Sequence, residues 1–107
     1  MNNLGRMMKQ AQEMQARMQE VQKKLEAEEI TGISGGGMVE VTLTGKGEAR
    51  RVKIDPNLAD PSDLEVIEDL IVAAFNDAKG KVDAHLAEEM AKVAGGLGLP
   101  PGLGLGP

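Results

Sequence analysis

Apolar side chains recur at alternating spacings of three and four residues along the first quarter of the chain, and glutamine, lysine and arginine fill most positions between them. An unbroken 3.5-residue repeat is typical of a helix that packs against a partner helix along its whole length. The pattern predicts a long amphipathic helix from about Asn2 or Asn3 to around Glu28. We call its narrow apolar stripe the seam, which consists of Leu4, Met7, Ala11, Met14, Met18, Val21 and Leu25.

Alternation of apolar and polar residues in the middle of the chain predicts strands. The clearest strand is residues 38–44, in which Val39, Val41 and Leu43 share one face. After a Gly-Lys-Gly turn, residues 49–54 return as a second strand with an apolar face of their own. Weaker extended character at residues 29–34 predicts a further strand before them. We therefore expect a small antiparallel sheet containing a hairpin with one buried and one solvated face.

Helical periodicity returns in the second half of the chain and continues to about Val93. Two alternative caps can begin this helix: Asp60 followed by a proline at the first helical position, or a capping box of Ser62 and Glu65. The apolar stripe is broad over the first half of the helix, as in a helix that covers a sheet. The stripe consists of Leu64, Ile67, Ile71, Ala74, Ala78, Val82, Leu86 and Val93, widened by Leu70, Phe75 and Met90.

The last residues have a different composition. Residues 95–107 contain six glycines, three prolines and four leucines. So much glycine and proline opposes a helix and predicts a mobile tail. We expect one small domain over residues 1–94, followed by this tail.

The predicted fold class is α+β, with two long helices flanking the sheet. Helices of about 25 and 33 residues are ~37 and ~50 Å long, whereas a compact domain of this size has a radius of gyration of only ~13 Å. The helices must therefore project from the sheet or pair with a second copy. The heptad pattern and the open sheet edges together predict a homodimer with a clamp-like outline.

Composition and charge support a thin core and a local affinity for anions. Among 107 residues there is one aromatic residue and no cysteine, so neither a disulfide nor a thiolate metal site can form. No apolar run approaches the ~18 residues of a membrane span, and no signal peptide is evident. We expect a soluble cytoplasmic protein without a membrane partner. The net charge is −5, divided into +3 over residues 1–25 and −8 over residues 26–107.

No residue pattern supports catalysis, a metal or another cofactor. His85 is the only histidine, and with Glu88 and Glu89 it lacks the second histidine of a zinc-protease motif. A solvated histidine is therefore the favoured interpretation. The triple glycine at residues 35–37 is not followed by Gly-Lys-Ser/Thr or by a helix, so a flexible turn is favoured over a phosphate-binding loop. We expect neither an enzyme nor a small-molecule substrate.

Two groups of basic residues are candidates for binding a polyanion. Those on the first helix exceed its acids, although positions that flank a heptad seam are commonly charged. Those at residues 50–53 either meet phosphates or pair across the hairpin with Glu40 and neighbouring acids. Without interleaved aromatics, base stacking is disfavoured, which leaves duplex DNA held through its backbone. The candidates are Arg6, Lys9, Arg17, Lys23 and Lys24, followed by Arg50, Arg51 and Lys53.

Five stretches carry a likeness to known sequences. They are residues 7–12 (Met-Met-Lys-Gln-Ala-Gln), 35–42 (Gly-Gly-Gly-Met-Val-Glu-Val-Thr), 45–56 (Gly-Lys-Gly-Glu-Ala-Arg-Arg-Val-Lys-Ile-Asp-Pro), 64–78 (Leu-Glu-Val-Ile-Glu-Asp-Leu-Ile-Val-Ala-Ala-Phe-Asn-Asp-Ala) and 98–102 (Gly-Leu-Pro-Pro-Gly). In this order they resemble the YbaB/EbfC family of bacterial nucleoid-associated proteins over nearly the whole chain.

The resemblance implies an α-β-β-β-α protomer, a tweezer-shaped homodimer and DNA binding without a catalytic step. Because binding in the family is generally placed on the projecting helices, it favours Arg6, Lys9 and Arg17 first. Lys79, Lys81 and Lys92 on the second helix come next. The strand cluster matches the family pattern, and the tail lacks basic residues, so we expect no DNA role for it.

These observations predict a nucleoid-associated homodimer that binds double-stranded DNA mainly through phosphates and contributes to chromosome organisation or gene regulation. The alternative is a coiled-coil interaction protein or chaperone-like protein, because a methionine-rich seam with glutamine-rich flanks also suits adaptable peptide binding. The two hypotheses differ in the role of charge. DNA binding requires the excess of basic residues on the first helix, whereas peptide binding does not.

Overall fold

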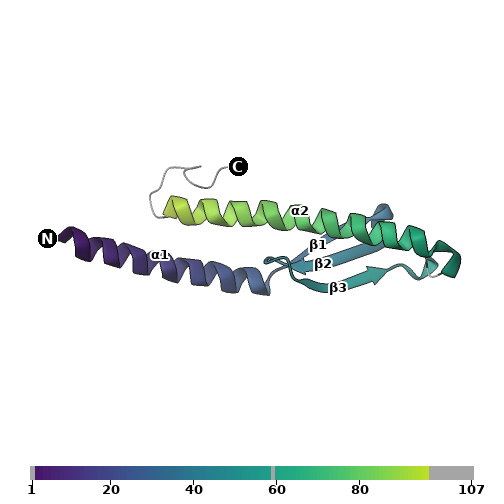
Figure 1. The fold of residues 1–107 in the computed structure, drawn as a ribbon, viewed down its shortest axis with the longest axis horizontal. Coiled ribbons are helices and arrows are strands. Elements are labelled where there is room, and N and C mark those ends of the chain that lie inside the picture. Colours follow the sequence, from purple (N-terminus) through teal and green to yellow (C-terminus); the bar gives the residue numbers. More distant parts are fainter. Residues whose placement is uncertain (1, 59, 97–107) are drawn as a thin grey trace.

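A computed structural model describes residues 2–58 and 60–96. The order of elements is helix, three strands, helix, which confirms the predicted α+β class and the α-β-β-β-α order (Figure 1). The helices and strands are α1 (Asn2–Ala27), β1 (Glu29–Ser34), β2 (Val39–Thr44), β3 (Ala49–Ile54) and α2 (Leu64–Gly96).

The three strands form one antiparallel sheet in the order β1-β2-β3. In the register between β2 and β3, Val39 lies opposite Ile54 and Val41 opposite Val52, with an irregularity after Thr42. Residues opposite one another share a face of the sheet. All four of these apolar side chains therefore point toward the side on which α2 lies.

Helix α2 packs on that face over β1 and β2, and the contact is close because the facing residues are small. A methyl group at Gly32 of β1 would overlap the backbone of Ala74 and Ala78. Both alanines are fully buried. The core that results consists of Val39, Val41, Leu43, Ala74, Ala78 and Val82, which is as thin as the composition indicates.

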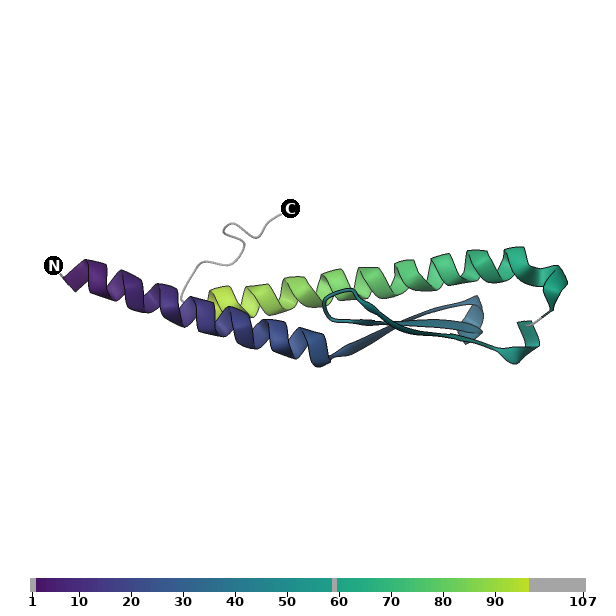
Figure 2. The ribbon, with the colours of Figure 1, turned by 60° about the horizontal axis from the view of Figure 1, so that its bottom comes forward.

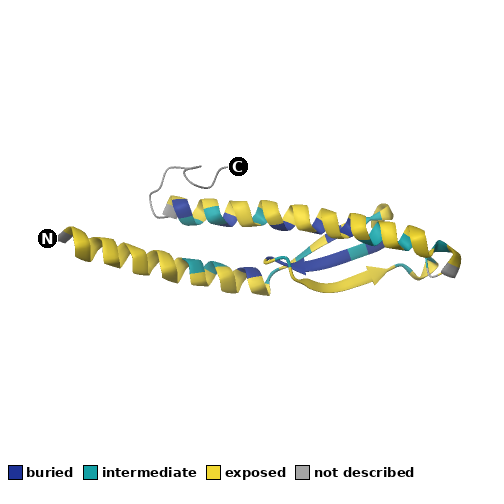
Figure 3. Ribbon diagram, viewed as in Figure 1, coloured by how far each residue is buried: buried dark blue, intermediate teal, exposed yellow. Residues whose placement is uncertain are grey.

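Strand β3 lies outside the cover of α2 (Figure 3). Val52 and Ile54 are 48% and 37% exposed although they share the apolar face of the sheet. The prediction of a hairpin with one buried face is thus right for β2 and wrong for β3 in the single chain. Conversely, Thr42 and Thr44 are buried on the expected wet face, and the hydroxyls of Thr31 and Thr42 are 2.9 Å apart.

The start of α2 follows the first of the two predicted caps. The Asp60 carboxylate accepts a hydrogen bond from the backbone N–H of Ser62 at 3.0 Å, which begins a 3₁₀ turn over residues 61–63. The α-helix continues from Leu64 to Gly96, three residues beyond the expected end. The predicted mobility of the tail beyond Gly96 concerns residues 97–107, which lie outside the described residues.

The molecule is long and narrow, as the helix lengths predict. Its principal extents are 73 × 24 × 16 Å and its radius of gyration is 19.5 Å. Helices α1 and α2 run antiparallel, and α1 extends past the C-terminal end of α2 in both views (Figures 1 and 2). Among the described residues, no helix is long and apolar enough to cross a membrane. The predicted homodimer is not tested by a single chain.

Candidate nucleic-acid interface

Helix α1 presents exposed cations that have no partner among the described residues. Arg6, Lys9, Arg17 and Lys23 are all exposed. Within residues 2–58 and 60–96, none of the four forms an ion pair or a side-chain hydrogen bond. Arg6 and Arg17 are eleven residues apart, which places them on one row of the helix about three turns apart. Their guanidinium groups are therefore available to an external anion.

Most of the other predicted DNA-binding residues are already engaged. Lys79 pairs with Asp83 at 2.6 Å, and Lys81 pairs with Asp77 at 3.2 Å and donates to the carbonyl of Thr31. These contacts hold α2 together or fix it to β1. The engaged residues are Lys24, Arg50, Arg51, Lys79, Lys81 and Lys92; the free ones among the described residues are Arg6, Lys9, Arg17, Lys23 and Lys53.

The cluster at residues 50–53 is divided between these two groups. Arg51 donates two hydrogen bonds to Glu29, at 3.0 and 3.1 Å, from β3 across β2 to β1. These bonds lower the pKa of Glu29 below its ordinary value and raise that of Arg51. Arg50 donates to the carbonyl of Glu26 at 3.1 Å. Cross-sheet pairing, one of the two sequence interpretations, therefore occurs for Arg51, with a partner on β1 instead of Glu40.

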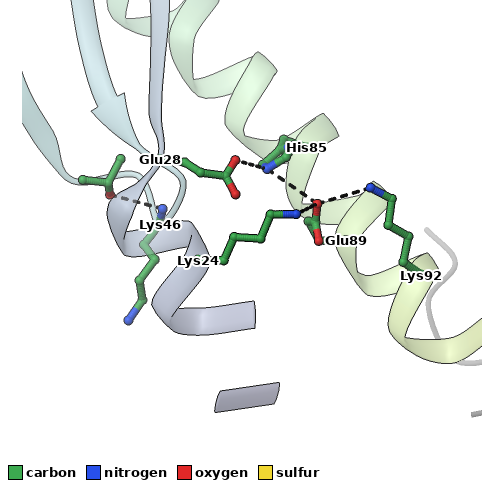
Figure 4. A network of polar contacts seen from close by, with 7 residues as sticks. Lys24, Glu28, Lys46, His85, Glu89 and Lys92 are labelled. Carbon is green, nitrogen blue, oxygen red and sulfur yellow. Dashed lines mark hydrogen bonds and ion pairs between the residues drawn. The ribbon is translucent and has the colours of Figure 1, made fainter. Parts of the chain in front are cut away.

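An ionic network joins the base of α1 to α2 (Figure 4). Glu89 is only 4% exposed, and one of its oxygens receives Lys24 at 2.8 Å and Lys92 at 3.5 Å. The hydrogen bond from Lys24 lowers the pKa of Glu89 and raises the pKa of Lys24. Beside it, His85 Nε2 lies 2.5 Å from Glu28 Oε2. Lys24 thus links the base of α1 to the C-terminal half of α2.

The burial of Glu89 was missed by sequence reasoning, although a signal existed. Glu89 follows Val82 by seven residues, which places it on the same stripe of α2 that covers the sheet. A buried acid on an apolar stripe needs a partner that neutralises its charge or donates a hydrogen bond to it. The partner, Lys24, is 65 positions away in the sequence, and no local pattern identifies it.

The same network contains three residues of types that bind metal ions. Glu28, His85 and Glu89 each offer a ligand atom within 4.8 Å of the others. However, the ammonium groups of Lys24 and Lys92 both contact the Glu89 oxygen that a metal ion would need. Two cations beside two carboxylates leave no excess negative charge to attract a divalent ion. We therefore interpret this cluster as an ion-pair network.

Comparison with known proteins identifies the family to which this chain belongs. Residues 1–97 match the YbaB/EbfC DNA-binding family. The chain belongs to this family. It is 65% identical to a nucleoid-associated protein of Rhodospirillum centenum and 63% identical to one of Paramagnetospirillum magneticum, each over 98% of both chains. A crystal structure of an uncharacterized Helicobacter pylori protein, 28% identical, aligns with a TM-score of 0.61 over 73% of this chain and 90% of that one.

Proposed function

We propose that this member of the YbaB/EbfC family is a nucleoid-associated protein that binds duplex DNA as a homodimer, mainly through phosphate contacts and without a catalytic step. The observation that carries the proposal is the set of exposed cations on α1 that have no partner among the described residues. Relatives at 63–65% identity are named nucleoid-associated proteins, which supports a place at the bacterial chromosome.

Phosphate contact fits the charge distribution better than base readout does. Residues 1–25 carry +3 and the remaining residues carry −8, so DNA is attracted to α1 and repelled by the body. The only aromatic residue, Phe75, lies on α2 beside the sheet, away from the α1 cations. Arginine and lysine without aromatic neighbours form contacts to the DNA backbone that carry little sequence information.

A homodimer is supported by the uncovered flank of the sheet. Asp77 accepts the backbone N–H of Ile33 at 2.9 Å, so β1 lies beneath that side of α2. Phe75 is about 160° around the helix from Asp77, which directs it toward the β3 side. Phe75, Val52 and Ile54 are all exposed there. We call these three residues the β3 flank, and a second copy packed against it would enlarge the thin core.

The test is fluorescence anisotropy with a mixed-sequence duplex of about 30 base pairs at several salt concentrations. If each protomer neutralises two or three phosphates, the logarithm of the binding constant should fall with the logarithm of salt concentration with a slope of roughly −4 to −5. The triple variant Arg6→Gln, Lys9→Gln and Arg17→Gln should bind more weakly and show a much shallower slope, because it removes the free cations.

A matched control removes the same charge elsewhere. Lys79→Gln, Lys81→Gln and Lys92→Gln delete three cations that already have acidic partners, so the slope should change little once circular dichroism shows that the variant is folded. Equal losses in both triple variants would contradict a specific role for α1. No binding at low salt by the folded wild-type protein would overturn the proposal.

The alternative, a coiled-coil interaction or chaperone-like protein, is favoured by one observation. The seam residues Leu4, Met7 and Met14 are 69%, 63% and 45% exposed, which is unusual for three apolar residues on one helix face. If peptide binding were the activity, the Arg6, Lys9 and Arg17 triple variant would retain it. Retained activity with no DNA binding would therefore select this alternative.

A further inference from the structure

The seam of α1 is covered only at its C-terminal end. Leu25 is buried and Met18 is partly buried beside α2. Nearer the N-terminus, Leu4, Met7 and Met14 are 69%, 63% and 45% exposed, because α1 continues where α2 has ended (Figures 1 and 2). A helix in a protein gains most of its stability by packing its apolar face. Among the described residues, nothing packs on this part of the seam.

The contact between the two helices shows how much of α1 lies beyond α2. The helices are antiparallel, and Lys24 Nζ lies 2.8 Å from Glu89 Oε1. Seven residues lead from Glu89 to Gly96, the last residue of α2, and seven lead back along α1 from Lys24 to Arg17. Both helices advance about 10 Å over that distance, so α2 ends about level with Arg17. Residues 4–14, which we call the tip of α1, therefore lie beyond α2, and a second helix can pack on their seam without displacing it.

The seam of the tip is complementary in size to a second copy of itself in the antiparallel orientation. Its residues are Leu4, Met7, Ala11 and Met14. Two antiparallel tips can place Leu4 opposite the partner's Met14 and Met7 opposite the partner's Ala11, so that each small residue faces a large one. Parallel tips would instead place two alanines opposite one another and leave a gap. They would also bring together two bodies whose residues 26–107 each carry −8.

The residues that flank the seam carry no charge that opposes such pairing. In a heptad repeat the e and g positions lie beside the apolar seam, and like charges there repel between two copies. On and next to the tip these positions hold Asn3, Met8, Gln10 and Gln15. The charged residues Arg6, Lys9 and Glu13 occupy c and f positions, which face away from a paired helix. Pairing therefore buries no charge and leaves the two cations accessible.

We propose that the tip of α1 pairs with the tip of a second copy as a short antiparallel coiled coil. The helices would overlap along about 15 Å. A stable interface buries about 800 Å² per partner and uses about 20–30 residues a side, roughly twice what the tip offers. The pairing is therefore weak and forms at high local concentration. Molecules bound side by side on DNA would reach such a concentration, a consequence that rests on the proposed function, whereas the pairing itself does not.

The test is sedimentation equilibrium of the full-length protein without DNA, from micromolar to millimolar concentrations. Ala11→Glu places an unpaired carboxylate in the seam and should weaken the association of the wild type by at least about tenfold. Ala16→Glu is the matched control, because Ala16 is also exposed but lies on the opposite side of α1. It should associate like the wild type. No association by the wild type, or equal association of the two variants when circular dichroism shows both folded, would overturn the proposal and leave the seam to a partner of another kind.

Disulfide formation tests the orientation. The chain has no cysteine, so Met7→Cys and Ala11→Cys each introduce a single thiol. When the two variants are mixed and oxidised with oxidised glutathione, antiparallel pairing predicts that most cross-linked product joins one chain of each kind, because the Cα atoms of a disulfide lie within about 7 Å. Mass spectrometry distinguishes this product from disulfides between identical chains, which parallel pairing would give and which would overturn the proposal.

These experiments separate tip pairing from the proposed function. Neither contains DNA, so failure of DNA binding would not change their outcome. The β3 flank is intact in every variant, so association through it would be equal in Ala11→Glu and Ala16→Glu. Only pairing through the tip predicts a difference between these two variants.

Discussion

Glu89 is a buried carboxylate that one lysine from α1 and one from α2 neutralise. Because the hydrogen bond from Lys24 lowers its pKa in the folded protein, its contribution to stability is present above the pKa of the unfolded state and is lost as pH falls through the folded value. The contribution therefore begins to shrink below about pH 4.3, the ordinary pKa of glutamate, and is lost once the pH has fallen through the lower pKa of the folded state, where the protonated acid no longer pairs with Lys24. This residue should therefore make the junction of α1 and α2 sensitive to acid.

We expect Glu89→Gln to lower the free energy of unfolding at pH 7, because it leaves Lys24 without its carboxylate. The difference from wild type should be constant between about pH 6 and 7 and shrink as pH falls below about 4.3. Urea denaturation at a series of pH values measures it. Glu88→Gln, at the neighbouring exposed position, should show a much smaller effect. A difference that grows in acid would show that the assignment of this ion pair is wrong.

Strand β3 presents apolar side chains on the same face as the core, but α2 does not reach them. An exposed edge strand with apolar residues is a ready site for association with another chain. The β3 flank of Val52, Ile54 and Phe75 is the surface on which the proposed dimer depends. A charge there should oppose association without disturbing the core, because the core residues lie on β2 and α2.

Val52→Asp should raise the dimer dissociation constant by about a hundredfold or more, since an unpaired carboxylate would be buried in the interface. Sedimentation equilibrium measures this change. Ile33→Asp is a closely matched control: Ile33 is also 48% exposed and β-branched, but it lies on β1 and on the opposite face of the sheet. Dissociation of both variants, or of neither, would contradict an interface at the β3 flank.

The elements were predictable because their signals are local. The seam, the alternation of Val39, Val41 and Leu43, and the Asp60 cap all lie within a few residues of the structures they determine. The exposure of β3 was not predictable, since it depends on where α2 lies across the sheet. The close approach at Gly32 sets that position through contacts more than forty residues away in the sequence.

The candidate interface was predictable only as a list of cations. Sequence alone places Arg17 and Lys24 on one helix with equal claims to bind DNA. The structure separates them, because the partner of Lys24 is a buried acid from the other end of the chain. Lys79 and Lys81 are likewise paired with acids one turn away. Which cations are free is a property of tertiary structure.

At the scale of the whole molecule, an acidic body carries basic projections. The chain has a net charge of −5, and the N-terminal part of α1, which carries the free cations Arg6 and Lys9, extends beyond the end of α2. Exposed charges farther apart than the Debye length, ~8 Å at physiological ionic strength, are largely screened from one another, so projection weakens the effect of the body's acids on these cations. In the proposed dimer, two such helices contact one duplex. The affinity for DNA should therefore fall on dissociation to monomers, although each protomer keeps its own phosphate contacts.

This dependence can be measured through the salt slope. If both α1 helices of a dimer contact DNA, Val52→Asp in its monomeric form should show about half the wild-type slope, because the number of neutralised phosphates is halved. The affinity of this monomer for DNA should fall by more than the added negative charge explains, because the two α1 helices are no longer joined in one dimer and cannot bind the duplex together. Ile33→Asp adds the same charge and should keep the full slope. If the monomer kept the full slope, all phosphate contacts would come from one protomer, and the two-helix clamp would be wrong even if the protein binds DNA.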